Sequence, residues 1–215
     1  MGTGLISHDK EFIFIKNMKT GGSSIAKVLD QYGTFPKEEA LNVIPQWSER
    51  HNSHITPHHG RASELIRLRE FAQNWDNYFK FAFVRNPWSL LVSWYFHKGP
   101  GNLFPQKYPS FEMFILKNGW NDRRYKFEGC YDRICNEHGD LMVDFVGKYE
   151  NLAEDFDHIC TKIGLEGLTL PHKRKGVYRD KYTTYYTDET KEIVGEEFEI
   201  DIEKFGYKFE EEKNK

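Results

Sequence analysis

Short apolar runs alternate with amphipathic stretches along much of the chain. Phe12–Ile15 is entirely apolar, which is typical of a strand buried in a parallel sheet. After a polar turn, Ile25, Val28, Leu29 and Tyr32 fall at i, i+3, i+4 and i+7 and predict one face of a helix. This part of the chain therefore predicts a strand, a glycine-containing loop and a helix.

The same order of elements is predicted once more after residue 80. Phe81–Val84 forms a second apolar run, and Asn86 followed by Pro87 is typical of a helix N-cap and first turn. The helix behind them has an apolar stripe that comprises Trp88, Leu91, Val92, Tyr95 and Phe96. Its other edge is predicted to present Ser89, Ser93 and His97, which are spaced by four residues.

A third strand is predicted within residues 143–149. Asn151 and Glu154 have the spacing of a capping box at the start of the next helix, and Gly164 is predicted to end that helix. Other helices are predicted at about residues 37–41, from about Arg61, over 110–117 and from about Asp188. Because strands alternate with helices, we expect an α/β fold with a central, mainly parallel sheet flanked by helices. A single domain over residues 1–209 and a charged tail over 210–215 are predicted.

Composition and charge narrow the class of protein. Hydrophobic residues make up 39% of the 215 residues and aromatic residues 16%, which predicts a packed interior. The net charge of −3 excludes a generally basic protein that coats nucleic acid. Residues 188–215 carry a net charge of −6, so the rest of the chain is mildly basic.

The cysteines and the hydropathy predict a compartment. Cys130, Cys135 and Cys160 form no CxxC pair and no zinc spacing, so reduced thiols are expected, with a Cys130–Cys135 disulfide left open. No apolar run approaches the ~18 residues that a membrane span requires, and residues 1–10 lack the apolar region of a signal peptide. We therefore expect a cytoplasmic protein without a membrane span.

The loop after the first strand has the composition of an anion-binding site. Glycines let backbone N–H groups converge, the next helix contributes its positive end, and a lysine adds charge. The residues predicted to bind the anion are Lys19, Thr20, Gly21, Gly22, Ser23 and Ser24. In an NTPase loop the lysine follows the glycines, whereas here it precedes them, and no metal-binding Asp ends the second strand. We therefore expect an anion site without a metal; a plain glycine-rich turn with a surface lysine is the alternative.

The loop after the second strand predicts another anion contact. Arg85 follows the strand directly, where a guanidinium can bind a phosphate with two parallel hydrogen bonds. Ser93 lies two turns into the following helix. The alternative is a solvated arginine and a surface serine. Two such loops at the carboxyl ends of strands suit a ligand with two separated anionic groups.

Several segments together resemble sulfotransferases that use 3′-phosphoadenosine 5′-phosphosulfate (PAPS). FIFIKNMKTGGSSIAKVL resembles their 5′-phosphosulfate loop, and FAFVRNPWSLLVSWYF resembles their 3′-phosphate segment. The match is closest to the carbohydrate branch, to which HHGRASEL, VGKYENLAEDF, YTTYYTDETKEIV and DIEKFGYKF are also similar. Met18 stands where those enzymes have proline, and residues 33–57 and 98–140 are unmatched. We expect the chain, which is much shorter than the Golgi members, to lack their membrane anchor.

The resemblance implies sulfuryl transfer from PAPS to a hydroxyl acceptor, most simply on a sugar or glycan, with neither nucleic acid nor metal involved. It implies that Arg85 and Ser93 bind the 3′-phosphate. We expect Lys19 to stabilise the leaving phosphate and His59 to act as the general base, with His58 and His54 as alternatives. Arg174, in a basic run, is expected to contact the donor; a solvated loop is the alternative.

Other assignments stay open at this point. Trp47, Tyr108 and Trp120 could stack on a sugar or simply pack in the core. A small-molecule kinase or NTPase, or a catalytically silent nucleotide-binding module, are the rival functions. The sequence defines neither the acceptor nor the oligomeric state.

Overall fold

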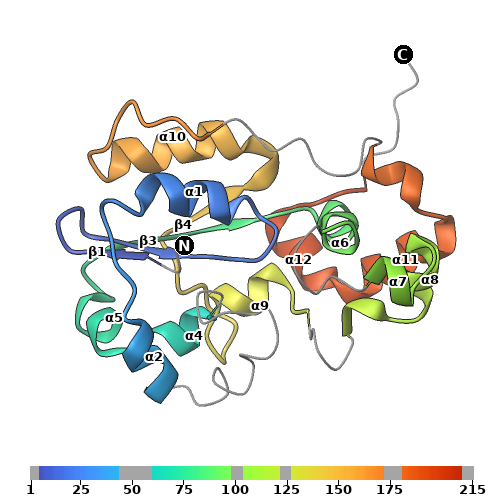
Figure 1. Cartoon of the computed structure of the whole chain (residues 1–215), viewed down its shortest axis with the longest axis horizontal. Coiled ribbons are helices and arrows are strands. Elements are labelled where there is room, and N and C mark those ends of the chain that lie inside the picture. Colours follow the sequence, from blue (N-terminus) through green and yellow to red (C-terminus); the bar gives the residue numbers. More distant parts are fainter. Residues whose placement is uncertain (1–4, 44–59, 98–103, 122–126, 172–180, 210–215) are drawn as a thin grey trace. The chain divides into compact units, whose positions relative to one another are not determined.

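The computed structural model describes residues 5–43, 60–97, 104–121, 127–171 and 181–209 (Figure 1). The chain divides into two compact units, of which the first contains Met1–Val84 and Cys130–Lys173 and the second contains Arg85–Gly129 and Arg174–Lys215. One domain over residues 1–209 stays a prediction. The predicted tail, 210–215, lies outside the described residues.

The first unit is built on a four-stranded sheet with the strand order β1-β2-β3-β4. Strands β2, β3 and β4 run parallel, while β1 pairs antiparallel to β2. The strands are β1 (Leu5–Ser7), β2 (Phe12–Ile15), β3 (Phe79–Val84) and β4 (Phe145–Lys148). The predicted α/β class with a mainly parallel sheet is confirmed; the edge strand β1 was not predicted.

Helices cover both faces of this sheet (Figure 1). One face carries α1 (Gly22–Leu29) and α10 (Leu152–Lys162), the latter preceded by the 3₁₀ helix Tyr149–Asn151. The other face carries α2 (Lys37–Val43), α4 (Ala62–Leu65), α5 (Arg69–Asn74) and α9 (Cys130–Ile134). Phenylalanines of β2 and β3 pack with α1 and α10 in one core cluster, in which the Phe14 and Phe81 rings stack at 5.0 Å between centroids.

The end of α10 confirms a sequence prediction, whereas its start corrects one. Gly164 is in the left-handed region with φ 66°, and Leu165 N donates to Cys160 O at 2.8 Å, as in a glycine-terminated helix. No side chain caps the start, so the predicted box of Asn151 and Glu154 is wrong. The 3₁₀ turn before α10 replaces it.

The helix predicted from about Arg61 is also corrected, because the chain forms α4 and α5 instead of one helix. Leu68 is extended, with φ −79° and ψ 136°, and its side chain is fully buried, as is that of Phe71. The break thus lets Leu68 pack into the core. Arg61 N donates to Glu64 Oε2 at 2.9 Å at the start of α4.

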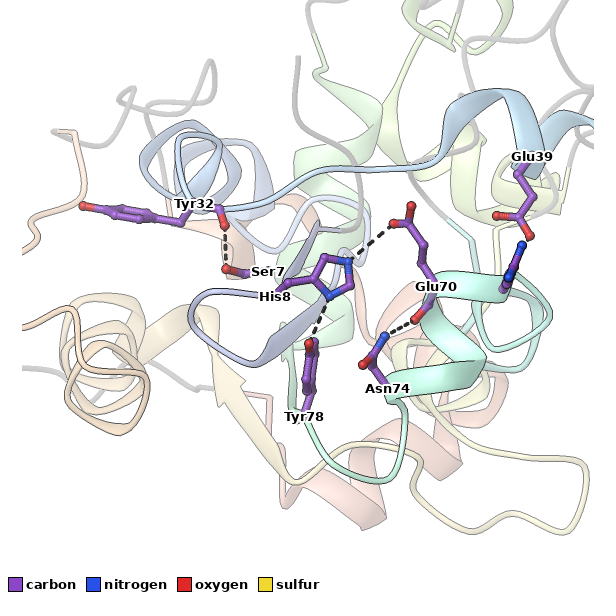
Figure 2. Close-up of polar contacts among 8 residues, drawn as sticks. Ser7, His8, Tyr32, Glu39, Glu70, Asn74 and Tyr78 are labelled. Carbon is purple, nitrogen blue, oxygen red and sulfur yellow. Dashed lines mark hydrogen bonds and ion pairs between the residues drawn. The ribbon is translucent and has the colours of Figure 1, made fainter.

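Polar contacts join the β1–β2 turn to its neighbours in the first unit (Figure 2). His8 Nδ1 lies 3.0 Å from Tyr78 Oη, and His8 Nε2 lies 3.9 Å from Glu70 Oε2. Ser7 Oγ donates to Tyr32 O. These bonds hold the edge strand against the segments that follow α1 and α5.

The second unit is helical among its described residues. Its helices are α6 (Pro87–Tyr95), α7 (Phe104–Lys107), α8 (Phe111–Leu116), the 3₁₀ helices Gly119–Asn121 and Tyr182–Tyr185, α11 (Asp188–Glu197) and α12 (Glu199–Phe205). Helices α6, α8 and α11 were predicted at these positions; α7 and α12 were not. Tyr108 and Trp120 are buried in the aromatic packing of this unit, so the sugar-stacking alternative for these two is wrong. Trp47 lies outside the described residues.

The three cysteines are buried thiols, so the Cys130–Cys135 disulfide that the sequence left open is not formed. Burial, aided by Asp157 and Glu166, raises the pKa of the Cys160 thiol to about 11. Among the described residues, no helix is long and apolar enough to cross a membrane.

Candidate functional site

The first predicted anion loop leads from β2 directly into α1. Gly21, the N-cap residue, is left-handed with φ 82°, and no side chain caps the helix. Lys19 is also left-handed, with φ 63°, and is half-buried. A lysine in this conformation costs of the order of 1–3 kcal/mol, and such strain is concentrated at functional positions. The loop thus presents a lysine and a glycine-capped helix start.

Two neighbouring contacts require both glycines of this turn. A Cβ atom on Gly21 would lie 2.9 Å from Leu152 Cδ2 of α10, and a Cβ atom on Gly22 would lie 2.8 Å from Lys16 Cγ. Thr20 is fully buried, and its Oγ1 donates to Asn17 O at 3.1 Å. The Thr20 hydroxyl proton is therefore used inside the loop. Ser23 is exposed and Ser24 half-buried.

Gly21→Ala is expected to destabilise the protein by about 2–3 kcal/mol, because the alanine would be both left-handed and against Leu152. Gly164→Ala is the matched control: it has a similar φ of 66° but nothing within 4 Å of the added Cβ. The control should cost only about 1–2 kcal/mol. Urea unfolding measures both, and equal losses would show that the contact with Leu152 does not matter.

Asn17 ties this loop to the neighbouring strand. It is almost fully buried, and its Nδ2 donates to Phe83 O at 3.1 Å, next to the carboxyl end of β3. Its Oδ1 is buried with no hydrogen-bond partner among the described residues. A buried acceptor of this kind favours an additional polar group or water at the loop.

The second predicted loop places a buried arginine beside a serine. Arg85 is 3% exposed, and its Nε and Nη2 donate to Ser89 Oγ at 3.0 and 2.8 Å. The alternative of a solvated arginine is therefore wrong. Ser93, one turn further along α6, is half-buried. Sequence reasoning noted the spacing of these serines but gave Ser89 no role; the i, i+4 spacing from Arg85 was the available signal.

Helix α6 starts as predicted, but more of its residues are buried than the apolar stripe in the sequence predicted. Asn86 Oδ1 accepts from Trp88 N at 3.1 Å, Pro87 follows it, and Asn86 Nδ2 donates to Lys208 O at 2.9 Å. Trp88 Nε1 donates to Lys191 O at 3.0 Å. Every residue of α6 except Ser93 is buried, so Ser89 of the predicted polar edge is packed, whereas Ser93 is half-buried. This packing fixes the turn that carries Arg85.

Comparison with known sequences assigns these loops to a family. The sequence model of the sulfotransferase family matches residues 4–208, which includes both loops and most of each unit. The chain belongs to the sulfotransferase family. A relative from Archaeoglobus fulgidus, an uncharacterized protein, is 36% identical over 102 residues, which is 47% of this chain and 80% of that protein.

Membership of the sulfotransferase family makes the chain a transferase, and the described loops contain most of its predicted donor-binding residues. Two predicted residues, His59 and Arg174, lie outside the described residues, as do His51, His54 and His58. His97 is exposed at the end of α6. Within the described ranges, no three His, Cys, Asp or Glu side chains come together as a metal-ligand set.

One electrostatic feature of the sulfotransferase loop was not predicted. Lys16 is only 6% exposed, and burial lowers the pKa of its ammonium to about 8, against a smaller opposing effect of Asp30. The sequence pattern placed Lys16 in a polar turn. Its position directly after an apolar strand was the only sign that it would be buried.

Proposed function

We propose that this sulfotransferase transfers the sulfuryl group of PAPS to a hydroxyl group of a carbohydrate. The observation that carries the proposal is the start of α1, which is capped by glycine alone and preceded by a left-handed lysine. Backbone N–H groups at such a helix start bind phosphate without a metal. The resemblance to PAPS-dependent enzymes supports the assignment of this phosphate to the 5′-phosphosulfate of the donor.

The proposed reaction is an in-line displacement at sulfur. The acceptor oxygen forms a bond to sulfur while the bond from sulfur to the 5′-phosphate oxygen breaks, and the acceptor proton passes to His59. The electron pair of the broken bond stays on the phosphate, and Lys19 stabilises the charge that develops there. Backbone N–H groups of residues 20–23 hold the same phosphate, whereas Ser24 N donates to Gly21 O at 2.9 Å.

The proposed roles of the remaining residues concern the rest of the donor. Arg85 and Ser93 bind the 3′-phosphate, and Ser89 holds the Arg85 guanidinium in place through the bonds described above. Arg174 contacts the donor from the basic run. The three buried thiols support a reducing compartment, and we propose the cytoplasm.

Arg85→Ala is expected to weaken binding of 3′-phosphoadenosine 5′-phosphate (PAP) by about 2–3 kcal/mol, because a charge-assisted contact to the 3′-phosphate is lost. Binding of adenosine 5′-monophosphate, which lacks that phosphate, should change little. Calorimetric titration of the wild type and the variant with each ligand measures the two losses of affinity. Equal losses for both would mean that the buried Arg85 serves only the fold.

Transfer itself is tested with PAPS that carries labelled sulfate and a panel of sugars, glycans, phenols and amines. We expect label on a carbohydrate hydroxyl, with EDTA present throughout. Label only on a phenol or an amine would contradict the proposed acceptor class. Binding of PAPS without transfer to any acceptor would favour a silent nucleotide-binding module.

A further inference from the structure

The side chain of Lys16 lies under the first residue of α1. A Cβ atom on Gly22 would be 2.8 Å from Lys16 Cγ and 3.5 Å from Cε, so the whole aliphatic stem runs past the helix start. Only 6% of Lys16 is exposed. A buried positive charge is thus held next to the end of α1 that already carries the positive pole of the helix dipole.

In the protein alone, this arrangement is electrostatically unfavourable. Burial disfavours the charged form of a lysine, and the amino end of a helix repels a cation. The lowered pKa of Lys16, about 8, reflects the burial, which outweighs the effect of Asp30. The other charged residues on its loop, on α1 and on the neighbouring strand β3, within the described ranges, are Lys19, Lys27 and Lys80, the last paired to Asp144 at 2.9 Å.

An anion at the start of α1 removes this conflict, because it attracts both the helix pole and the ammonium. The buried Asn17 Oδ1, in the next residue, is a polar atom at this loop that lacks a partner among the described residues. A water molecule that bridges it to a bound anion would satisfy it.

We propose that Lys16 supplies a second positive charge, besides Lys19, for the 5′-phosphosulfate end of the donor. This inference rests on the proposed function, and it makes donor binding depend on a proton that Lys16 holds. Binding of the anion favours the charged ammonium, so Lys16 takes up a proton when the donor binds at a pH at which Lys16 is partly neutral.

The sign of the pH effect separates this role from a structural one. Above about pH 8 the unfolded chain, with an ordinary lysine, holds more protons than the folded chain, so titration of Lys16 makes the empty protein more stable as the pH rises. The affinity for the donor anion changes in the opposite direction and falls. A lysine that merely supports the loop would give the same rise in stability, but the affinity for the donor anion would not change with pH.

The test is the affinity of PAP for the whole chain between pH 7 and 9.5, together with proton uptake at pH 8.5, both by calorimetry. If the bound anion raises the pKa of Lys16 by about one unit, wild-type affinity should fall about five- to tenfold over this range, with measurable uptake. Lys16→Met should bind about tenfold more weakly at pH 7 and lose most of the pH dependence.

Two further variants keep the test decisive. Lys16→Arg stays charged at every pH in the range, so it should keep its affinity and lose the pH dependence. Lys27→Met, at an exposed position of α1, should behave like wild type. An unchanged pH dependence in the Lys16 variants would assign the proton elsewhere and overturn the inference.

If the Lys16 variants do not fold, measurements on the wild-type protein alone still test the role of Lys16. Absence of proton uptake and of pH dependence in wild type would overturn the role of Lys16 while the donor assignment survives. Failure of PAP to bind at pH 7 would instead contradict the proposed function.

Discussion

His59→Ala is expected to lower kcat by about 10²–10⁴-fold, because the acceptor hydroxyl loses the base that takes its proton. The affinity for PAP should stay near the wild-type value, since the proposed donor contacts lie elsewhere. His59 precedes α4, whose N-cap is Arg61, and it matches the histidine segment that the family resemblance identifies. Single-turnover rates with labelled PAPS and the best acceptor measure the effect.

His58→Ala is the matched control, because it removes the neighbouring imidazole from the same segment. It should lower kcat far less than His59→Ala. If His58→Ala were inactive and His59→Ala active, the general base would be assigned to His58 instead. Normal turnover by both variants would contradict a general base in this segment, but it would not contradict the proposed donor site.

Removal of the Lys19 side chain is expected to lower kcat by about 10²–10³-fold, because the charge that develops on the leaving phosphate loses its stabilising group. Lys19→Gly is the most informative variant. The native φ of 63° is strained for lysine but not for glycine, so this variant should keep or gain thermal stability while it loses activity.

This combination separates catalysis from support of the loop. A lysine that mattered only for folding would show a lower Tm together with lower activity. Lys27→Gly removes a lysine from an exposed position of α1 and should show helix destabilisation of about 1 kcal/mol with nearly normal kcat. Full activity of Lys19→Gly would contradict the proposed role.

Local patterns in the sequence predicted much of the fold. Apolar runs marked β2 and β3, because strands covered on both faces need no polar residues. Asn86, Pro87 and Gly164 marked helix ends correctly, since each acts through its own backbone or a bond to a close neighbour.

Features set by tertiary packing were not predictable in the same way. The break before α5 depends on burial of Leu68, and the capping signal of Asn151 gave way to a 3₁₀ turn. At the candidate site, the sequence identified Lys19 and Arg85 by charge and position. The burial of Lys16 and the bond from Arg85 to Ser89 were not predicted, because position and spacing alone gave weak signals and both depend on what surrounds these side chains.

The central claim, that the loops bind a donor with a 3′-phosphate and without a metal, is tested most directly by calorimetric titration in EDTA. PAP, adenosine 5′-monophosphate and ATP are titrated into the wild-type chain under the same conditions. We expect PAP to bind at least about tenfold more tightly than either of the others, since only PAP carries the phosphate proposed for Arg85. ATP binding that equals or exceeds PAP binding, or loss of all binding in EDTA, would contradict the account.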